Sequence, residues 1–118
     1  RLSCASLAEA STVLDSEYPW LSLPPTPKLP RPRQGHYVQI NGARIWYQTY
    51  GSSNAQSLLF LHNGFANSDY WGKQIRALKS KYHCIVMDSR GHGRSTTSSA
   101  NLTFDLMASD AIGLLNHL

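Results

Sequence analysis

The stretch Val86-Met87-Asp88-Ser89-Arg90-Gly91-His92-Gly93-Arg94-Ser95 decides the fold of this chain. It begins inside an apolar run, His83–Met87, that is too short for a helix and predicts a buried strand. Gly91 and Gly93 allow backbone angles that other residues avoid, and Asp88 can accept from backbone N–H groups or pair with an arginine. The composition therefore predicts a tight, internally hydrogen-bonded turn leaving the sheet. The alternative is an ordinary glycine-rich loop that cradles a phosphate.

The composition fits one small domain of 118 residues, with 42% apolar and 15% charged residues. The net charge of +4 is modest, and its basic cluster lacks an accompanying aromatic platform, so we expect a solvated face and no nucleic-acid partner. No apolar run approaches the roughly 20 residues of a membrane span. The two cysteines form no disulfide framework, and Cys84 is interpreted as a core residue. The basic cluster is Lys28, Arg31, Arg33 and Arg44.

Residues 1–35 are predicted to form an extended, proline-rich leader, because all six prolines lie there and can neither continue a helix nor donate to a sheet. We expect this leader to be strapped onto the domain surface, with Tyr18, Trp20 and Leu21 as docking residues. A ligand for an SH3-like module, Pro24–Pro27 or Pro27–Pro30, is the alternative.

The chain starts at Arg1 and not at methionine, which is consistent with an upstream piece having been lost or removed. It lacks the charged start and apolar core of a signal peptide. Asn101-Leu102-Thr103 could be glycosylated in a secreted protein, but such triplets arise often by chance. The localisation is left unassigned, with a cytoplasmic protein favoured over a secreted one.

Regular structure is predicted from residue 36 onward. Asn41-Gly42 is a strong two-residue turn between two β-rich segments, 36–40 and 43–50, and predicts a β-hairpin. An apolar strand follows at 57–62, and then a helix that we expect Ser68 to cap. After the strand at 83–87, Thr103 is expected to cap a second helix. Its predicted apolar face is formed by Phe104, Met107, Ala108, Ala111, Ile112, Leu115 and Leu118.

The pattern D-x-R-G-x-G-x-S, complete over Asp88–Ser95, resembles the loop after the fourth strand of α/β-hydrolases. A second motif, Leu61-His62-Asn63-Gly64-Phe65, is similar to the oxyanion loop that follows their third strand. The resemblance runs from about Tyr37 to Leu118 and is closest to esterases, lactonases and carbon–carbon hydrolases. It implies an α/β fold in which residues 36–118 are the N-terminal portion: a hairpin, then β-α-β-α, with an incomplete sheet.

The resemblance also implies the roles of individual residues. The amide of Gly64 or of Phe65 would stabilise the negative charge that develops during acyl transfer, and His62 would be a structural residue and not the catalytic base. Asn63 stands where the family usually has glycine, and asparagine tolerates left-handed backbone angles better than other residues. The remaining motif residues are expected to hold the loop and not to touch substrate. They are Asp88, Arg90, Gly91, Gly93 and Ser95.

The family's nucleophile elbow, G-x-S-x-G, does not occur in the sequence. Ser89 has only the Ser-x-Gly half of that motif, and Asp105, Asp110 and His117 belong to the second helix and cannot complete a triad. The sequence thus predicts part of a serine-type hydrolase for an ester, lactone or similar small substrate, without metal or cofactor and inactive alone. A non-catalytic scaffold or binding module derived from a hydrolase is the alternative.

The family's early strands lie in the order one, two, four, three, with strand five beside three. The segment 57–62 is therefore expected to be an uncharged, proline-free edge in the isolated chain, which favours self-association. Replacing Leu59 with lysine should then raise the fraction of soluble monomer.

Overall fold

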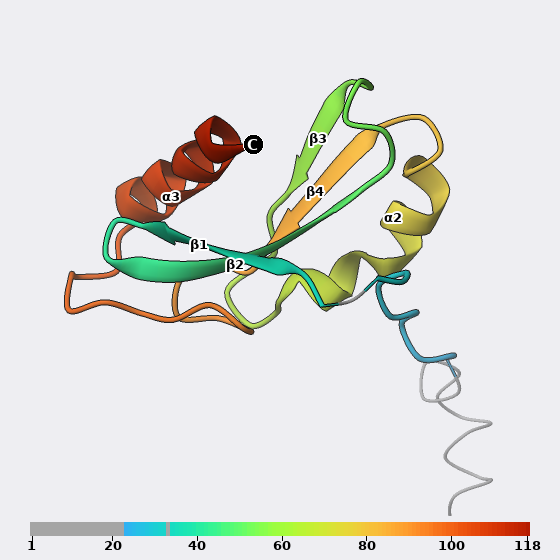
Figure 1. The fold of residues 1–118 in the computed structure, drawn as a ribbon. Helices are drawn as coiled ribbons and strands as arrows, with labels where there is room; N and C mark the ends of the chain where they lie inside the picture. Colours follow the sequence, from blue (N-terminus) through green and yellow to red (C-terminus); the bar gives the residue numbers. More distant parts are fainter. Residues whose placement is uncertain (1–22, 33) are drawn as a thin grey trace, which may run out of the picture.

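The computed structural model describes residues 23–32 and 34–118, which form a small mixed sheet with helices on both faces (Figure 1). Its order along the chain matches the predicted hairpin followed by β-α-β-α. The elements are β1 (His36–Ile40), β2 (Ala43–Tyr50), β3 (Ser57–Phe60), a 3₁₀ helix η2 (Ser68–Trp71), α2 (Gly72–Leu78), β4 (His83–Met87) and α3 (Phe104–His117).

The sheet has the strand order β1-β2-β4-β3, as the family resemblance predicts. β1 and β2 are antiparallel and joined at Asn41-Gly42, where both residues have positive φ angles, 48° and 76°. This is the primed turn that matches the twist of a hairpin. β2 pairs antiparallel with β4, and β3 pairs with β4 in parallel, so that β3 forms one edge of the sheet.

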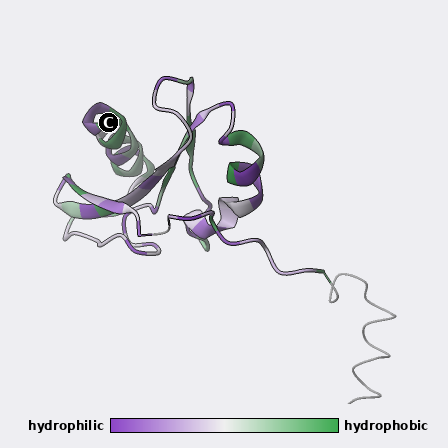
Figure 2. Ribbon diagram, turned by 45° about the vertical axis from the view of Figure 1, so that its right-hand side comes forward, coloured by the Kyte–Doolittle hydropathy of each residue, from purple (hydrophilic) through white to green (hydrophobic). Residues whose placement is uncertain are grey.

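Alternating residues of the central strands β2 and β4 build two separate core layers, because successive side chains of a strand point to opposite faces. The α3 side contains Ala43, Ile45, Tyr47, Ile85, Met87, Ala111 and Leu114, and the α2 side contains Leu29, Trp46, Tyr50, Ile75, Cys84 and Val86. Cys84 is fully buried, as predicted, and its burial raises the pKa of the thiol. Figure 2 shows hydrophobic and hydrophilic residues alternating around both helices.

The proline-rich segment lies against the α2 side of the sheet. Leu29 is only 1% exposed and packs with Trp46 and Ile75. The guanidinium of Arg76 donates to the Lys28 carbonyl at 3.1 Å, which fixes the segment to α2. Within the described residues, Lys28 and Leu29 are thus held against the domain. The division of the chain at residue 35 stays a prediction, and Tyr18, Trp20 and Leu21 lie outside the described residues.

The first helix differs from its prediction. Asn67, not Ser68, caps it, with the side-chain oxygen accepting from the Asp69 N–H at 2.9 Å. Ser68 is instead fully buried and bonded to Asp88, so its hydroxyl is used in the interior and not at the helix end. The helix begins as the 3₁₀ turn η2 and continues as α2 only from Gly72.

The second helix begins as predicted, with the Thr103 hydroxyl accepting from the Leu106 N–H at 3.1 Å. Its predicted apolar face, however, is mostly exposed: Phe104 is 89% exposed and Ile112 is 59% exposed. The buried residues of α3 are Asp110, Ala111 and Leu114, and Asp110 is held there in a buried ion pair with Arg90. Among the described helices, none combines the length and apolar character that crossing a membrane requires.

Candidate functional site

The candidate site is formed by two loops that leave the carboxyl ends of the parallel strands β3 and β4. The β3 loop comprises residues 61–67, and the β4 loop comprises residues 88–95. Because parallel strands end at the same edge of a sheet, both loops meet there. Three hydrogen-bonded ties hold the β4 loop to the β3 loop and to the first residue of η2. They involve His62, Gly64 and Ser68, each with a different residue of the β4 loop.

The first tie is the carboxylate of Asp88, which is completely buried. It accepts from the N–H and the hydroxyl of Ser68 at 2.8 and 2.5 Å, and from the N–H of Arg94 at 2.8 Å. The Arg94 guanidinium adds a contact at 3.2 Å. A Cβ atom at Gly93 would collide with this carboxylate, and Gly93 also has a φ of +51°. The glycine is therefore required for the loop to close on Asp88.

Arg90 connects the β4 loop to α3. It is 1% exposed and forms a bidentate ion pair with Asp110, at 2.5 Å from Nε and 2.7 Å from Nη2. This hydrogen-bonded pairing with Asp110 raises the pKa of Arg90. Ser98 and the Asn41 carbonyl take its remaining donors, at 2.8 and 3.3 Å. Neither Arg90 nor Asp88 reaches the surface.

Ser95 closes the β4 loop onto β2. Its hydroxyl donates to the Asp88 carbonyl at 2.6 Å and accepts from the Trp46 N–H at 2.8 Å. Arg94 lies over the Trp46 ring, 4.4 Å from the ring centroid, and pairs with Asp69 at the surface. Gly91 has a φ of +72°, a left-handed angle that favours glycine.

His62 uses both ring nitrogens inside the structure. Nε2 accepts from the Ser89 N–H at 2.9 Å, so the proton lies on Nδ1, which donates to the Asn63 carbonyl at 2.8 Å. That carbonyl also accepts from Ala66 N–H at 3.2 Å. The Asn63–Gly64 peptide is thereby held by its oxygen, and the Gly64 N–H points to the opposite side, without an acceptor among the described residues.

Asn63 stabilises the β3 loop through its side chain and not through the left-handed backbone angle that we expected. Asn41 is the single non-glycine residue with a positive φ in the described ranges, so Asn63 does not adopt a left-handed angle. Its side-chain oxygen instead accepts from the Phe65 N–H at 3.3 Å. Of the two predicted oxyanion donors, the Gly64 N–H thus has no acceptor among the described residues, and the Phe65 N–H is bonded to the Asn63 side chain.

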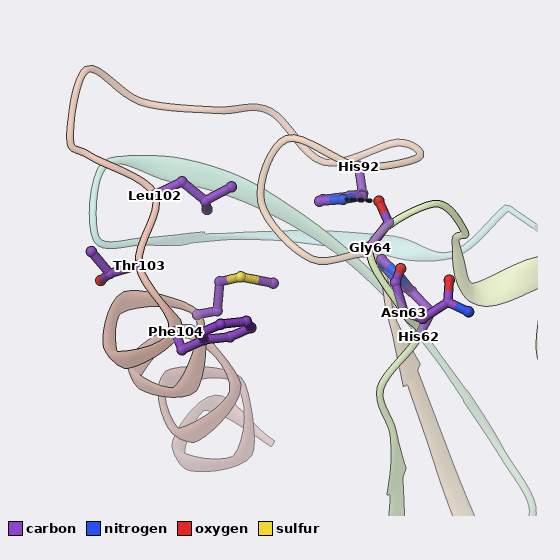
Figure 3. A pocket seen from close by; sticks show the side chains of 8 residues that line it. His62, Asn63, Gly64, His92, Leu102, Thr103 and Phe104 are labelled. Carbon is purple, nitrogen blue, oxygen red and sulfur yellow. Dashed lines mark hydrogen bonds between the residues drawn. The ribbon is translucent and has the colours of Figure 1, made fainter.

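A cavity of about 460 Å³ lies beside these loops (Figure 3). His62, Asn63, Gly64 and His92 lie on one side, and Leu102, Thr103 and Phe104, around the start of α3, lie on the other. Met107 of α3 also lines the cavity. An adjoining hollow includes Ser89. The lining is mainly apolar with a few polar groups, as in sites for small organic ligands.

Among the described residues, no base is in position beside the Ser89 hydroxyl. The imidazole of His62 bonds the Ser89 backbone N–H, and both nitrogens of that ring are occupied. The described residues also contain no group of three His, Cys, Asp or Glu side chains that could hold a metal ion.

Sequence reasoning missed three residues of this site. Ser68 and Asp110 each lie 20 residues from the partner that they contact, so no local pattern indicates either contact. His92 occupies a variable position of the motif, yet its Nε2 contacts the Gly64 carbonyl at 2.9 Å.

A mixed β1-β2-β4-β3 sheet with a D-x-R-G-x-G-x-S loop beside a second loop at the same edge defines the class as the first part of an α/β-hydrolase. A family model described as the alpha/beta hydrolase fold matches residues 56–117. The chain belongs to this family.

Relatives with known activities agree with this assignment. Over 72 residues the chain is 36% identical to 3-oxoadipate enol-lactonase 2 of Acinetobacter baylyi. This match covers 61% of this chain and 27% of the lactonase. It is 32% identical to epoxide hydrolase 3 of Mus musculus over 75 residues, covering 62% of this chain and 20% of that protein.

Among solved structures, the enol-lactonase of Burkholderia xenovorans LB400 superposes with a TM-score of 0.66 at 25% identity. The match covers 69% of this chain and 32% of the lactonase. The chain thus spans a third or less of the length of these relatives, and it corresponds to their N-terminal region.

Proposed function

We propose that this chain supplies the oxyanion-binding half of a hydrolase site for a small ester or lactone. The observation that carries the proposal is the Gly64 N–H. It lies in the loop at the end of β3 beside the cavity, its peptide is fixed by His62 and Ala66, and no described residue accepts from it. A fixed, unoccupied N–H is what stabilises the negative charge of a tetrahedral intermediate, at about 3–4 kcal/mol for each donor.

The similarity to two enol-lactonases supports a lactone or ester as the substrate class. The epoxide hydrolase among the relatives shows that this part of the fold is shared by proteins named for other reactions. The nucleophile, the acid and the base of the triad would come from sequence other than these 118 residues, which contain no G-x-S-x-G.

The first prediction is that the 118-residue polypeptide alone is inert. We expect no turnover of short-chain aryl esters and no labelling by a serine-directed fluorophosphonate, because Ser89 has no base in position. Ser89→Ala is the control. Turnover that this substitution abolishes, or fluorophosphonate attached to Ser89, would contradict the proposal.

A chimera tests whether this chain can supply the oxyanion-binding part of an active hydrolase. The chain replaces the corresponding N-terminal region of 3-oxoadipate enol-lactonase 2, whose remainder would supply the elbow serine. We expect lactone hydrolysis that is lost when that serine becomes alanine. A chimera that folds, as judged by circular dichroism, but gives no hydrolysis would favour the non-catalytic scaffold.

We further propose that the isolated chain associates with itself through β3. This strand pairs with β4 alone within the described part of the chain, and its sequence, Ser57–Phe60, carries no charge and no proline. Exposed strands of this kind pair readily with other chains.

A further inference from the structure

We propose that His92 positions the Phe65 N–H as a second oxyanion donor, and that the Asn63 side chain masks this donor until a substrate oxygen replaces it. This inference rests on the function proposed above and assigns roles to two residues of the same loop pair.

The peptide between Gly64 and Phe65 is held at both of its polar atoms. On one side, the imidazole Nε2 of His92 lies 2.9 Å from the Gly64 oxygen (Figure 3). On the other side, the Phe65 N–H donates to the side-chain oxygen of Asn63 at 3.3 Å. Because this peptide is trans and planar, fixing the oxygen also fixes the direction of the N–H.

His92 itself is well placed to hold that oxygen. Its backbone is part of a tight turn, with the His92 N–H on the Ser89 carbonyl at 2.9 Å and the Ser95 N–H on the His92 carbonyl at 3.0 Å. Its Nδ1 lies 3.0 Å from the Arg90 carbonyl, so both ring nitrogens face backbone oxygens. The Nε2–H tautomer and the imidazolium both donate to Gly64, which leaves only the Nδ1–H tautomer unable to form this tie.

The Asn63 contact is the weaker of the two. At 3.3 Å it is longer than the usual 2.9–3.0 Å of an N–H···O bond. It forms on an exposed loop, where Phe65 has its side chain entirely in solvent. A charged oxygen binds an N–H more strongly than a neutral amide oxygen does, so a developing oxyanion displaces Asn63. The mask therefore costs little when the substrate reacts.

The sequence offers a specific probe of this peptide. Gly64-Phe65 is the single Gly-Phe pair in the chain, so carbonyl-¹³C glycine with ¹⁵N phenylalanine isolates one amide signal in carbonyl-filtered NMR spectra. Carbonyl-¹³C asparagine with ¹⁵N glycine gives two signals, from Asn63-Gly64 and from the hairpin turn Asn41-Gly42, which is an internal control. Neither readout needs an active enzyme.

We expect His92→Phe to shift the Gly64 carbonyl signal, because the hydrogen bond to that oxygen is lost. Exchange of the Phe65 amide should become about two- to tenfold faster, which corresponds to the free energy of one hydrogen bond. His92→Gln should restore both values, because its amide nitrogen lies near the position of Nε2, whereas His92→Asn, which reaches only the Nδ1 position, should not. Asn63→Ala should speed exchange of the Phe65 amide alone. The Asn41-Gly42 signal should not change in any variant.

His83→Phe is the matched ring control, since the hydrogen bond of that imidazole within the described ranges is to the exposed Ser57 hydroxyl, at 3.1 Å. An unchanged Gly64-Phe65 signal in His92→Phe would overturn the positioning role, and unchanged exchange in Asn63→Ala would overturn the mask. In the chimera, His92→Phe should lower kcat about tenfold with KM unchanged and His92→Gln should recover it. Equal kcat in the unmodified chimera, His92→Phe and His92→Gln would refute the role of His92 in catalysis, even if the NMR result supports its contact with Gly64.

Discussion

The carboxylate of Asp88 has four donors around it and no exposure to solvent. Removing it leaves the N–H and hydroxyl of Ser68 and the N–H of Arg94 without their acceptor. A buried group that loses its partner costs about 1–3 kcal/mol. We therefore expect Asp88→Ala to lower the free energy of unfolding by about this amount, measured by urea denaturation followed by circular dichroism.

Asp69→Ala is the matched control for this prediction, because Asp69 pairs with the same Arg94 but is 46% exposed. A surface pair of this kind contributes at most about 1 kcal/mol. Equal destabilisation by the two substitutions would show that the buried bonds of Asp88 are not what holds the loops together. In the chimera, a normal unfolding curve with lost turnover would make Asp88 catalytic and not structural.

For individual residues, the sequence predicts the type of role better than the partner that each residue contacts. The motif identifies Asp88 and Arg90 as residues that hold a loop, and both are buried in the structure. It does not identify Ser68 or Asp110, because hydrogen bonds across 20 residues leave no periodic pattern. Ser68 even carries a misleading local signal, since a serine before a helix is also a good cap.

The strap of residues 27–30 is the element whose contribution the sequence underestimates. Prolines predict its extended backbone, but they give no indication that Leu29 enters the α2-side core. Gly72 shows how closely the strap packs, because a Cβ atom there would collide with the Pro27 carbonyl. The strap thus covers apolar surface of β2 and α2 that would otherwise face water.

We expect Leu29→Ala to lower the free energy of unfolding by about 2–5 kcal/mol, the usual cost of truncating a buried leucine. Leu23→Ala is the control, because Leu23 precedes the strap in the proline-rich part of the chain and is 70% exposed. Urea unfolding curves of both variants decide the matter. If the two curves coincide, the strap is not part of the folded core.

α3 shows why a periodic pattern alone does not determine a buried face. Its apolar residues recur at helical spacing, yet Leu114 is buried while Leu115 is 44% exposed. The face that is buried consists of Asp110, which pairs with Arg90, and the core residues Ala111 and Leu114. The apolar residues at the start of the helix, Phe104 and Met107, line the cavity beside the β3 loop.

For the whole molecule, strand positions and strand order follow from the sequence and the family resemblance. The hairpin, the β4 strand and the order β1-β2-β4-β3 agree with prediction. The hairpin and the β4 strand depend on local alternation and turn chemistry, which a sequence displays directly, whereas the strand order is what the family resemblance implies. The directions of the Gly64 and Phe65 amides depend on contacts between two loops, and only the structure supplies them.

The free edge of the sheet can be located at individual backbone groups. The His83 N–H donates to the Gln56 carbonyl at 3.0 Å, and Ser57 is the register partner of His83. In a parallel ladder the backbone groups of such a partner residue point away from the neighbouring strand. The N–H and C=O groups of Ser57 and Leu59 are therefore directed outward, ready to pair with another chain.

Leu59→Lys, the substitution that the sequence suggests, is not the sharpest probe of this edge, because Leu59 packs against the α3-side core. Ser57→Pro is better. Ser57 is exposed, its N–H points outward, and proline is tolerated at the first residue of an edge strand. It removes a donor and places a ring where a second strand would pair, without removing a core side chain.

We therefore expect Ser57→Pro to raise the monomer fraction of the 118-residue chain in analytical ultracentrifugation over a range of protein concentrations. Ser57→Ala is the matched control, because it loses the same hydroxyl and its contact with His83 but keeps the outward N–H. It should associate like the unmodified chain, since the backbone edge and not the side chain makes the contact. A monomeric unmodified chain, or equal association of the proline and alanine variants, would show that β3 is not the surface through which copies meet.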